Sequence, residues 1–597
     1  DTVLDLNGKT LTLNGEIGIV VNNNTSFTVC DSSVAQPPQV TDKYAVNYSS
    51  GKIQHNNNSN CAIQVQNGAN FTLESGTIYS EKGNGVNVLA QTNPNNEEKY
   101  NSSATINGGY ISAQEFGIGV YGRTAVLNVN GGVIEARDNA AVAGNGSRDA
   151  DYTPEGYVIN VNEGTLIGKI TSDGYASCGI YHPNAGTVNV IGGEIISTKG
   201  AGIVARAGQT NISGGRITAL GESNFAGKVG DSRVVVSTSG VVLDLAANYG
   251  GADIENGVAT NADVYVSGEA TISGTNSSID VIEEQGSSGS EVREQDNVII
   301  TGGTFTKLTG ETSSSDPISK DFFPDGALLT QDETTGKVTV GQATEESPAI
   351  AEFNGVPYTS LQNAINMAKD GETVTLRQNT TENVTIKEGQ DLVLDLNGYT
   401  LNGGITAGKA ALTSYGTVTI QDSSAGQTGR IQREENGQTS AYYVLDNHSK
   451  MTIAGGTIYN NSGDNANGAS LIRNIGTKES AATLEITGGN LQQDNFIVVK
   501  NDDYGKLTVT GGTIISKNNQ AIQNWNDAEI KGGLMDGQVI TWSYTEVPNN
   551  AKMEIKGGKI DGPVMAINYY SNNSYGTAPN VIISETACIT GELGTYT

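Results

Sequence analysis

The chain is poor in basic residues. Lys and Arg number 34 against 64 Asp and Glu in 597 residues, so the formal net charge is −30. Nucleic acids and anionic membranes are bound by clustered Lys and Arg, and the sequence has no such cluster. The charge balance therefore argues against a nucleic-acid partner. It indicates an acidic protein that stays in solution, with carboxylates at turns that leave room for divalent cations.

Long apolar runs and histidines are scarce as well. No run of about 18 apolar residues occurs, so no membrane insertion is expected in this stretch. The three histidines, His55, His182 and His448, are not followed by Gly. The sequence also lacks a Ser-His-Asp set, a zinc-ligand spacing and a phosphate loop, which argues against the common catalytic motifs.

Glycine, in contrast, recurs in a fixed phrase: a Gly-Gly pair, any residue, and then an apolar residue. Neighbouring phrases are often 21 to 33 residues apart, which is the length of one solenoid rung. Short strands flank each pair, and glycine lets the chain turn with φ above zero. The sequence therefore predicts an all-β fold of stacked rungs that bury their apolar faces on one another. The pairs begin at Gly108, Gly131, Gly192, Gly214, Gly302, Gly455, Gly488, Gly511, Gly532 and Gly557.

The apolar residue after each pair is expected to point into the solenoid. Because it keeps the same place in every rung, these residues should form one buried stack. The stack is predicted to contain Ile111, Ile134, Ile195, Ile217, Ile458, Ile514 and Ile560.

A longer repeat lies over the rungs. The phrase at 3–8, Val-Leu-Asp-Leu-Asn-Gly, returns at 393–398, an offset of 390. Three turn glycines recur at a constant offset of 380: Gly76, Gly109 and Gly132 match Gly456, Gly489 and Gly512. Equal offsets predict a duplicated module rather than a chance likeness. We expect module 1 at 1–342 and module 2 at 343–597.

Module 2 starts with a segment that module 1 lacks. Residues 359–362, Thr-Ser-Leu-Gln, form a capping-box pattern, and the apolar residues at 361, 364, 365 and 368 share one helical face. The pattern predicts a cap at about 349–371, with a helix from about Ser360 to Lys369 that Gly371 ends. Module 1 begins inside its rungs and module 2 stops early. We therefore expect an excerpt of a longer array, without the first cap and the last rungs.

The four cysteines are Cys30, Cys61, Cys178 and Cys588. Cys61 and Cys178 hold the same rung position several rungs apart, and stacked strands are about 4.8 Å apart. That separation is too large for a disulfide. We expect four free thiols that are mostly buried.

Three features together resemble a known group: the phrase at 394–401, the cap at 358–365 and the Gly-Gly rungs. They are similar to the right-handed parallel β-helix repeats of large secreted or surface-anchored bacterial proteins, in the pectate-lyase-like superfamily. The segment 298–340 resembles the usual end of such a module. The resemblance implies two tandem right-handed parallel β-helices and an extracellular location, secreted or at the cell surface. It leaves the activity open, because this superfamily holds lyases, glycosidases, phage spikes and adhesins.

The catalytic sets that the resemblance implies are missing. Lyases of this fold hold calcium with carboxylates beside an Arg or Lys base, and the hydrolases use several Asp beside His-Gly and Arg-x-Lys. Neither set occurs here. Asp149 and Asp151 form an Asp-x-Asp that is able to bind calcium through oxygen, although local turn hydrogen bonds are the favoured interpretation. No cofactor is expected, and calcium is the single candidate.

An aromatic pattern appears when the rungs of module 2 are aligned on their last strand. The segments 522–525, 540–543 and 567–570 then stack, and both tryptophans of the chain lie there. Rings beside amides and guanidinium groups hold sugars by stacking and hydrogen bonding. The alternative is that the rings stack on one another and stabilise the solenoid. The candidate glycan-binding residues are Trp525, Trp542, Tyr544, Tyr569, Tyr570 and Arg473, with Tyr121, Arg123, Tyr181 and His182 in module 1.

Three functions remain open from sequence. The first is a non-enzymatic adhesin or rod module of a large bacterial surface protein, with a glycan or a host surface protein as its partner. Tandem modules would add reach and avidity to such a rod. The second is a polysaccharide lyase or glycoside hydrolase acting on host or dietary glycans. The third is a purely structural spacer.

Overall fold

The structure is a computed structural model. It describes residues 1–57, 60–90, 101–122, 124–144, 156–171, 174–183, 186–223, 225–229, 235–244, 254–255, 258–259, 262–282, 297–308, 322–324, 326–345, 347–368, 371–433, 442–460, 469–493, 495–543, 551–571, 574–575 and 577–596.

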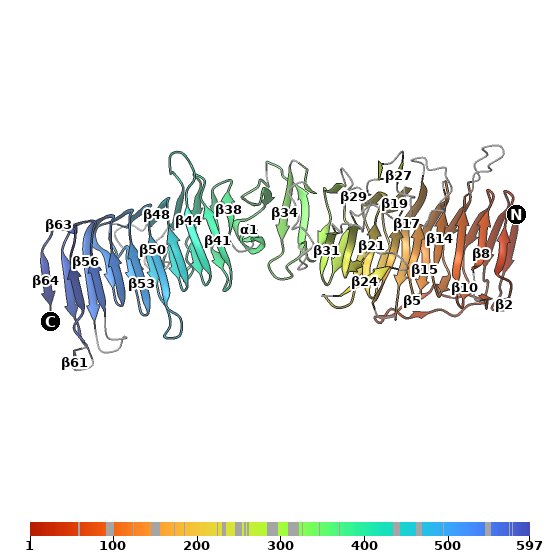
Figure 1. The fold of residues 1–597 in the computed structure, drawn as a ribbon, viewed down its shortest axis with the longest axis horizontal. Helices are drawn as coiled ribbons and strands as arrows, with labels where there is room; N and C mark the ends of the chain where they lie inside the picture. The colour runs from red at the N-terminus through yellow and green to blue at the C-terminus, as the bar shows by residue number, and fades with distance from the viewer. Residues whose placement is uncertain are drawn as a thin grey trace. The chain divides into compact units, whose positions relative to one another are not determined.

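The fold is nearly all-β. Strands make up 57% of the described residues, and α1 (Leu361–Met367) is the one helix among them. The prediction of a nearly all-β, parallel, solenoid-like structure is thereby confirmed. The chain divides into two compact units. Unit 1 holds Asp1–Ala327 and Gln331–Gln342, and unit 2 holds Leu328–Thr330 and Ala343–Thr597. In each unit the strands stack side by side, red to yellow in unit 1 and green to blue in unit 2 (Figure 1).

Unit 1 repeats three strands per coil, and equivalent strands of neighbouring coils pair in parallel. Column 1 contains β1 (Thr2–Asp5), β4 (Ser26–Cys30), β9 (Asn70–Leu73), β12 (Ser103–Ile106), β15 (Val126–Ala136), β17 (Tyr157–Gly168), β19 (Gly186–Val190), β22 (Gly208–Ile212), β29 (Ala262–Val266) and β32 (Asn297–Ile300). Column 2 contains β2 (Thr10–Leu13), β7 (Lys52–His55), β10 (Thr77–Ser80), β13 (Tyr110–Ala113), the second halves of β15 and β17, β20 (Glu194–Ser197), β23 (Arg216–Ala219), β30 (Thr271–Gly274) and β33 (Thr304–Phe305). Column 3 contains β3 (Ile17–Val21), β8 (Cys61–Gln66), β11 (Asn84–Leu89), β14 (Ile118–Tyr121), β16 (Ala140–Gly144), β18 (Tyr175–His182), β21 (Gly200–Ala205), β26 (Ser239–Asp244) and β31 (Ser277–Ile282).

Unit 2 repeats the same plan. Column 1 contains β38 (Glu372–Leu376), β41 (Asp391–Asp395), β44 (Thr417–Gln421), β47 (Lys450–Ile453), β50 (Ala482–Ile486), β53 (Gly505–Val509), β55 (Asp527–Ile530), β57 (Lys552–Ile555) and β62 (Asn580–Ile583). Column 2 contains β39 (Thr380–Thr381), β42 (Thr400–Asn402), β45 (Arg430–Arg433), β48 (Thr457–Asn460), β51 (Asn490–Gln492), β54 (Thr513–Asn524), β56 (Leu534–Ser543), β58 (Lys559–Asp561) and β63 (Cys588–Ile589). Column 3 contains β40 (Val384–Ile386), β43 (Leu412–Ser414), β46 (Leu445–Asn447), β49 (Ile472–Asn474), β52 (Val499–Asn501), the second halves of β54 and β56, β59 (Val564–Asn568) and β64 (Leu593–Tyr596).

The remaining strands are hairpins and end strands. β35 (Val338–Gln342) pairs antiparallel with β33 in unit 1, and β36 (Ala351–Phe353) pairs antiparallel with β37 (Val356–Tyr358) and β38 in unit 2. β34 (Ala327–Gln331) contributes residues to both units. The antiparallel hairpins are β5–β6 (Gln39–Val40, Val46–Asn47), β24–β25 (Ala226–Val229, Val235–Ser237), β27–β28 (Ile254–Glu255, Val258–Ala259) and β60–β61 (Tyr570–Ser571, Ser574–Tyr575).

Helix α1 lies where the capping-box pattern predicts a helix. The Ser360 hydroxyl accepts a hydrogen bond from the Asn363 N–H at 3.1 Å, and the Glu382 carboxylate accepts from the first two N–H groups of the helix. These bonds satisfy donors that a helix start leaves open. Leu361, Ala364 and Ile365 are buried, and α1 contacts β36, β38 and β40 of the first coil of unit 2.

The Gly-Gly pairs form corners that pack on one another from coil to coil. Gly132 has a φ of +74°, and a Cβ there would lie 2.7 Å from the carbonyl carbon of Gly108. A Cβ on Gly131 would lie 2.5 Å from the Asn107 carbonyl oxygen. Both residues of the pair therefore have to be glycine, the second for its backbone angle and each for the close approach of the next corner.

The apolar residue after each corner is fully buried, as expected from the repeat. The predicted single stack is in fact two, one in each unit, because the coils of each unit stack separately. In unit 1 the aligned residues are Ile111, Ile134, Leu166, Ile195 and Ile217. In unit 2 they are Ile458, Leu491, Ile514, Met535 and Ile560.

The recurring Asp-Leu-Asn-Gly phrase is a hydrogen-bonded corner in both units. Asp31, in the next coil, accepts from the Gly8 N–H at 2.9 Å, and Asp422 accepts from the Gly398 N–H at 2.8 Å. Burial alone would raise the pKa of each carboxyl, but hydrogen bonds from Ser side chains and backbone N–H groups hold it below its usual range. The carboxylates of the phrase itself, Asp5 and Asp395, also accept from backbone N–H groups. The duplicated phrase therefore supports the fold.

All four cysteines are free thiols in the structure. Cys61 and Cys178 are buried, Cys30 is half-buried and Cys588 is exposed. Burial raises the pKa of the Cys61 thiol to about 12, so this residue behaves as a small apolar side chain.

Candidate functional site

A ladder of buried asparagines runs through column 3 of unit 2. Each side-chain amide except the last donates to the amide oxygen in the next coil at 2.8 Å. Each also donates to a backbone carbonyl of column 1. Every member is fully buried, so the ladder fixes the bend that leads from column 3 to column 1. Its members are Asn447, Asn474, Asn501 and Asn524.

The residue after each ladder asparagine, and after Ser414 at the same position of the preceding coil, faces outward at the corner. Its backbone N–H donates to a carbonyl of the preceding coil at 2.8 or 2.9 Å, so these residues are held in register from coil to coil. We call this row the corner line. It consists of Tyr415, His448, Ile475, Asp502 and Trp525.

An aromatic strip continues the corner line. The rings of Trp525 and Trp542 are stacked, with centroids 5.5 Å apart and an interplanar angle of 20°. Tyr569 follows at 6.1 Å from Trp542 with a tilt of 60°, and 55% of Tyr569 is exposed. The alignment of 522–525 with 540–543 and 567–570 is wrong in its register, because Ile522 pairs with Val539 and Ile540 pairs with Met565, and the two tryptophans stack on each other instead of lying in separate columns. Trp525 Nε1 donates to Gln523 Oε1 at 2.9 Å, whereas the buried Trp542 Nε1 has no acceptor in the described part of the chain.

The stacking decides which ring surfaces are open. Trp525 and Trp542 cover part of each other's faces, as offset-stacked rings do, so their edges and outer faces remain. Tyr569 is tilted away from Trp542, and its face is the most open surface of the strip. The strip therefore both stabilises the coils and offers one free aromatic face.

A second aromatic group lies at the other end of the corner line. Arg473 donates to both oxygens of Asp446, from Nε at 2.8 Å and from Nη2 at 2.7 Å. His448 Nε2 is 3.3 Å from Asp446 Oδ2, and the His448 ring stacks on Tyr415 with centroids 4.8 Å apart. The Arg473 guanidinium also lies over the Tyr443 ring at 4.5 Å.

Asp446 is locked in this group as an anion. Its burial would raise the pKa of the carboxyl, but hydrogen bonds from His448 and Arg473 hold the pKa below its usual range. Because its charged form is held by these bonds, Asp446 has no proton to give. The group orders the surface rather than carrying out acid–base chemistry.

Sequence reasoning found Arg473 but missed its partners Asp446, His448 and Tyr415. The available signal was the spacing of the ladder. Asn447, Asn474 and Asn501 are each 27 residues apart, and each follows an apolar residue and a polar one. Aligning the chain on these asparagines places the corner line in one row.

The predicted site residues of unit 1 lie mostly inside. Tyr181 is 7% exposed and His182 fully buried. Tyr181 Oη accepts from Arg206 at 3.1 Å. Tyr121 is half-buried, accepts from Asn84 at 3.2 Å, and has its phenol pKa raised to about 12 by burial. These side chains stabilise unit 1 and do not form a continuous surface with one another.

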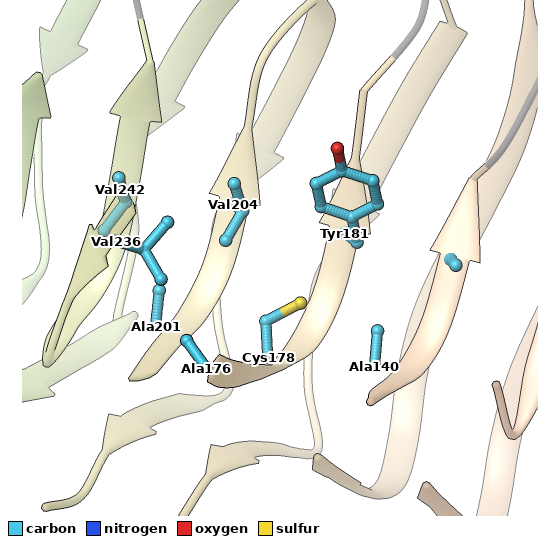
Figure 2. Close-up of a cluster of buried hydrophobic side chains, with 9 residues drawn as sticks. Ala140, Ala176, Cys178, Tyr181, Ala201, Val204, Val236 and Val242 are labelled. Atoms are coloured by element: carbon cyan, nitrogen blue, oxygen red, sulfur yellow. The ribbon is translucent and has the colours of Figure 1, made fainter. Parts of the chain in front are cut away.

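The outer face of column 3 in unit 1 is an apolar core of its own. Ala143, Tyr181, Val204 and Val242 hold one outward row on neighbouring strands. Val236 of β25 packs on this row (Figure 2). Phe225, beside β24, packs on the same cluster. The hairpin β24–β25 thus covers this face.

The other predicted site residues are not placed. Arg123, Tyr544, Asp149 and Asp151 lie outside the described residues, as does the side chain of Tyr570. Within the described residues no group of three or more His, Cys, Asp and Glu is arranged to hold a metal ion. No helix of this described part is long and apolar enough to cross a membrane.

The buried His182 makes the stability of unit 1 sensitive to acid. Tyr157 Oη lies 2.6 Å from His182 Nδ1, and burial lowers the pKa of this imidazole from 6.5 to about 3. The neutral ring is the folded form. Stability is therefore complete above the unfolded pKa of 6.5 and falls by up to about 1.4 kcal/mol per pH unit between 6.5 and 3.

We expect His182→Gln, which keeps a hydrogen-bond acceptor, to remove this pH dependence. Melting curves of the parent and the variant between pH 7.5 and pH 4.5 should converge as the pH falls. A constant difference across that range would show that His182 does not titrate on unfolding.

Comparisons with known proteins give no family. No protein-family model matches the chain, and no curated protein matches it in sequence.

Proposed function

We propose that the chain is a non-enzymatic rod module that binds a glycan through the corner line and aromatic strip of unit 2. The observation that carries this proposal is a difference between the two units. In unit 1 the outward row of column 3 is apolar and covered by β24–β25. In unit 2 the corresponding row is Asp446, Arg473, Lys500 and Gln523, and the rings beside it are partly exposed.

The chemistry of this face suits sugars. Tyr415 and Tyr569 are 48% and 55% exposed, so each presents an aromatic face to solvent. Amide, guanidinium and carboxylate groups flank them, and sugars need both ring faces and hydrogen-bonding partners. A host surface protein is the alternative partner on the same face.

We infer further that both units are right-handed parallel β-helices of the pectate-lyase-like kind, from a large bacterial protein that acts outside the cell. Three parallel strand columns per coil, glycine corners and inward apolar ladders support this assignment. The acidic composition suits an exposed, soluble rod. A lyase or hydrolase is less well supported, because Asp446 is fully bonded and glycosidases need a pair of reactive carboxylates.

A purely structural spacer is the second candidate. The stacking of Trp525 on Trp542 and the buried asparagine ladder favour it, since both would be useful to the solenoid alone. The two functions differ in what the exposed rings do, and this difference is measurable.

The test is the double variant Trp542→Ala with Tyr569→Ala, compared with Trp542→Phe and Tyr569→Phe together. A glycan array on the parent chain identifies a bound sugar, and titration calorimetry then gives the affinities. Losing two stacked rings at about 1 kcal/mol each should weaken binding about 30-fold. The Phe variant keeps the rings and should stay within a few-fold of the parent.

The melting temperature separates the two candidates. Binding that is lost with a shift of only a few degrees supports the glycan-binding proposal. A melting drop of many degrees, together with no sugar bound by the parent chain, would favour the spacer.

A further inference from the structure

We infer that the ligand is an uncharged, linear glycan that lies along the coil axis and touches both ends of the corner line, from Tyr415 to Tyr569. This inference rests on the proposed function, and it adds the chemical class of the ligand and its direction on the surface.

The direction follows from the register. Tyr415, His448, Ile475, Asp502 and Trp525 occupy one corner position in five successive coils, each tied by its N–H to the coil before. Trp542 and Tyr569 add two more steps. At about 4.8 Å per coil, the row spans about 29 Å. A ligand that uses both exposed tyrosines has to be extended and parallel to this row.

Two ring groups mark the ends of the row. Tyr415 stacks on His448 at one end, and Trp525, Trp542 and Tyr569 form the strip at the other. Ile475 and Asp502 between them carry no ring, so the middle offers a flat contact and a carboxylate acceptor for hydroxyl groups. Two separated ring platforms fit a repeating polymer better than a single compact sugar.

The charge of the ligand is inferred from the ion pairs that the basic residues of this face make. Arg473 is bonded to Asp446 at both oxygens, and Lys500 Nζ lies 2.7 Å from Asp502 Oδ2. Each cation of the outward row is thus paired with a carboxylate of the same face. A uronate or sulfated chain would find no unpaired cation among the described residues of the outward row, and it would also meet a protein of net charge −30.

An uncharged chain meets none of these penalties. Its hydroxyl groups are able to donate to Asp502, which is only partly buried, without breaking the ion pair to Lys500. An anion at Arg473 would instead meet a guanidinium whose charge the bidentate pair with Asp446 already balances.

The experiment compares ligand length and charge on the full chain. The probes are trisaccharides and octasaccharides of the neutral glucan, xylan, mannan and galactan series, with polygalacturonate and heparin as charged polymers. The variants are Tyr415→Ala, the matched control Tyr415→Phe, and the Trp542→Ala/Tyr569→Ala double variant. Tyr415 is half exposed, so its replacement should leave folding intact, and a melting curve verifies this.

We expect a neutral octasaccharide to bind at least tenfold more tightly than its trisaccharide, and the charged polymers not to bind at physiological salt. Tyr415→Ala should weaken the octasaccharide about five- to tenfold and leave the trisaccharide, held by the strip, unchanged. Tyr415→Phe should bind as the parent does.

Three results would overturn the inference, and they are distinguishable. If polygalacturonate or heparin binds more tightly than the neutral octasaccharides, the inferred absence of charge on the ligand is wrong. An octasaccharide affinity that Tyr415→Ala leaves unchanged, but that the double variant abolishes, would confine the site to the strip and leave the proposed function standing. Binding of no carbohydrate at all would overturn the inference and the proposed function together.

Discussion

Replacing Ile514 with Asp is expected to destabilise unit 2 by more than about 4 kcal/mol. Ile514 is fully buried and lies in register between Leu491 and Met535. A carboxylate there would have apolar neighbours in both adjacent coils and no partner for its charge. The variant also loses the burial of the Ile side chain, which contributes about 2–3 kcal/mol by itself.

Tryptophan fluorescence measures this effect without interference from unit 1. Both tryptophans of the chain, Trp525 and Trp542, lie in unit 2, so denaturant titrations followed at their emission report on this unit. Ile405→Asp is the matched control, because Ile405 is 49% exposed in the same unit and should change stability by less than about 0.5 kcal/mol. If Ile514→Asp unfolds at the same denaturant concentration as Ile405→Asp, the inward register assigned to the Gly-Gly phrase is wrong.

The side chains that point into the solenoid are predictable from the sequence because their direction depends on local spacing. A Gly-Gly corner fixes the backbone, and the second residue after it must then point inward, whatever the loops elsewhere do. Ile514 and Ile560 follow this rule. The short helix is predictable for the same reason, since Ser360 and its N-cap bond involve residues three apart in sequence.

The contacts of the outward-facing side chains depend on which coils become neighbours. Asp446 and Arg473 form an ion pair across 27 residues, whereas the next ladder step, from Asn501 to Asn524, spans 23. Coils of unequal length hide this register from any fixed-period alignment. The buried asparagines are the one local mark of the register, and the side chains that meet across the coils follow from strand pairing.

Inserted hairpins are the second reason why the outward-facing side chains cannot be predicted from the sequence. Tyr181 ends a strand much as Trp542 does, and both were predicted to face a ligand. Tyr181 is covered because Phe225 and Val236, from the inserted hairpin β24–β25, pack on the same cluster. Nothing in the strand around Tyr181 encodes this cover, since the hairpin comes from a later coil.

Replacing Asn474 with Ala is expected to cost unit 2 about 3–5 kcal/mol. Its side-chain amide donates to Asn501 Oδ1 at 2.8 Å and to the Lys506 carbonyl at 3.1 Å, and it accepts from Asn447 Nδ2 at 2.8 Å. Alanine has none of these groups and leaves three buried polar partners with a missing bond. Each unsatisfied group costs about 1–3 kcal/mol, and the Asn447 amide offsets part of this through its bond to the Thr483 carbonyl.

Asn518→Ala is the control that separates the effect of burying the polar groups from the effect of losing a hydrogen bond. Asn518 is exposed and donates to the Asn495 side chain of the neighbouring coil at 3.0 Å, so the bond lost is of the same chemical type. Water replaces it there, and the loss should stay below about 1 kcal/mol. The stability of both variants is measured by the same tryptophan emission.

Equal losses of stability in the two variants would mean that the ladder contributes no more than a surface pair, and the corner line would then need another explanation for its register. A large loss of stability in Asn474→Ala alone would show that the buried ladder stabilises the coils. The positions of Ile475 and Trp525 at the surface would then depend on this ladder, because each follows a ladder asparagine.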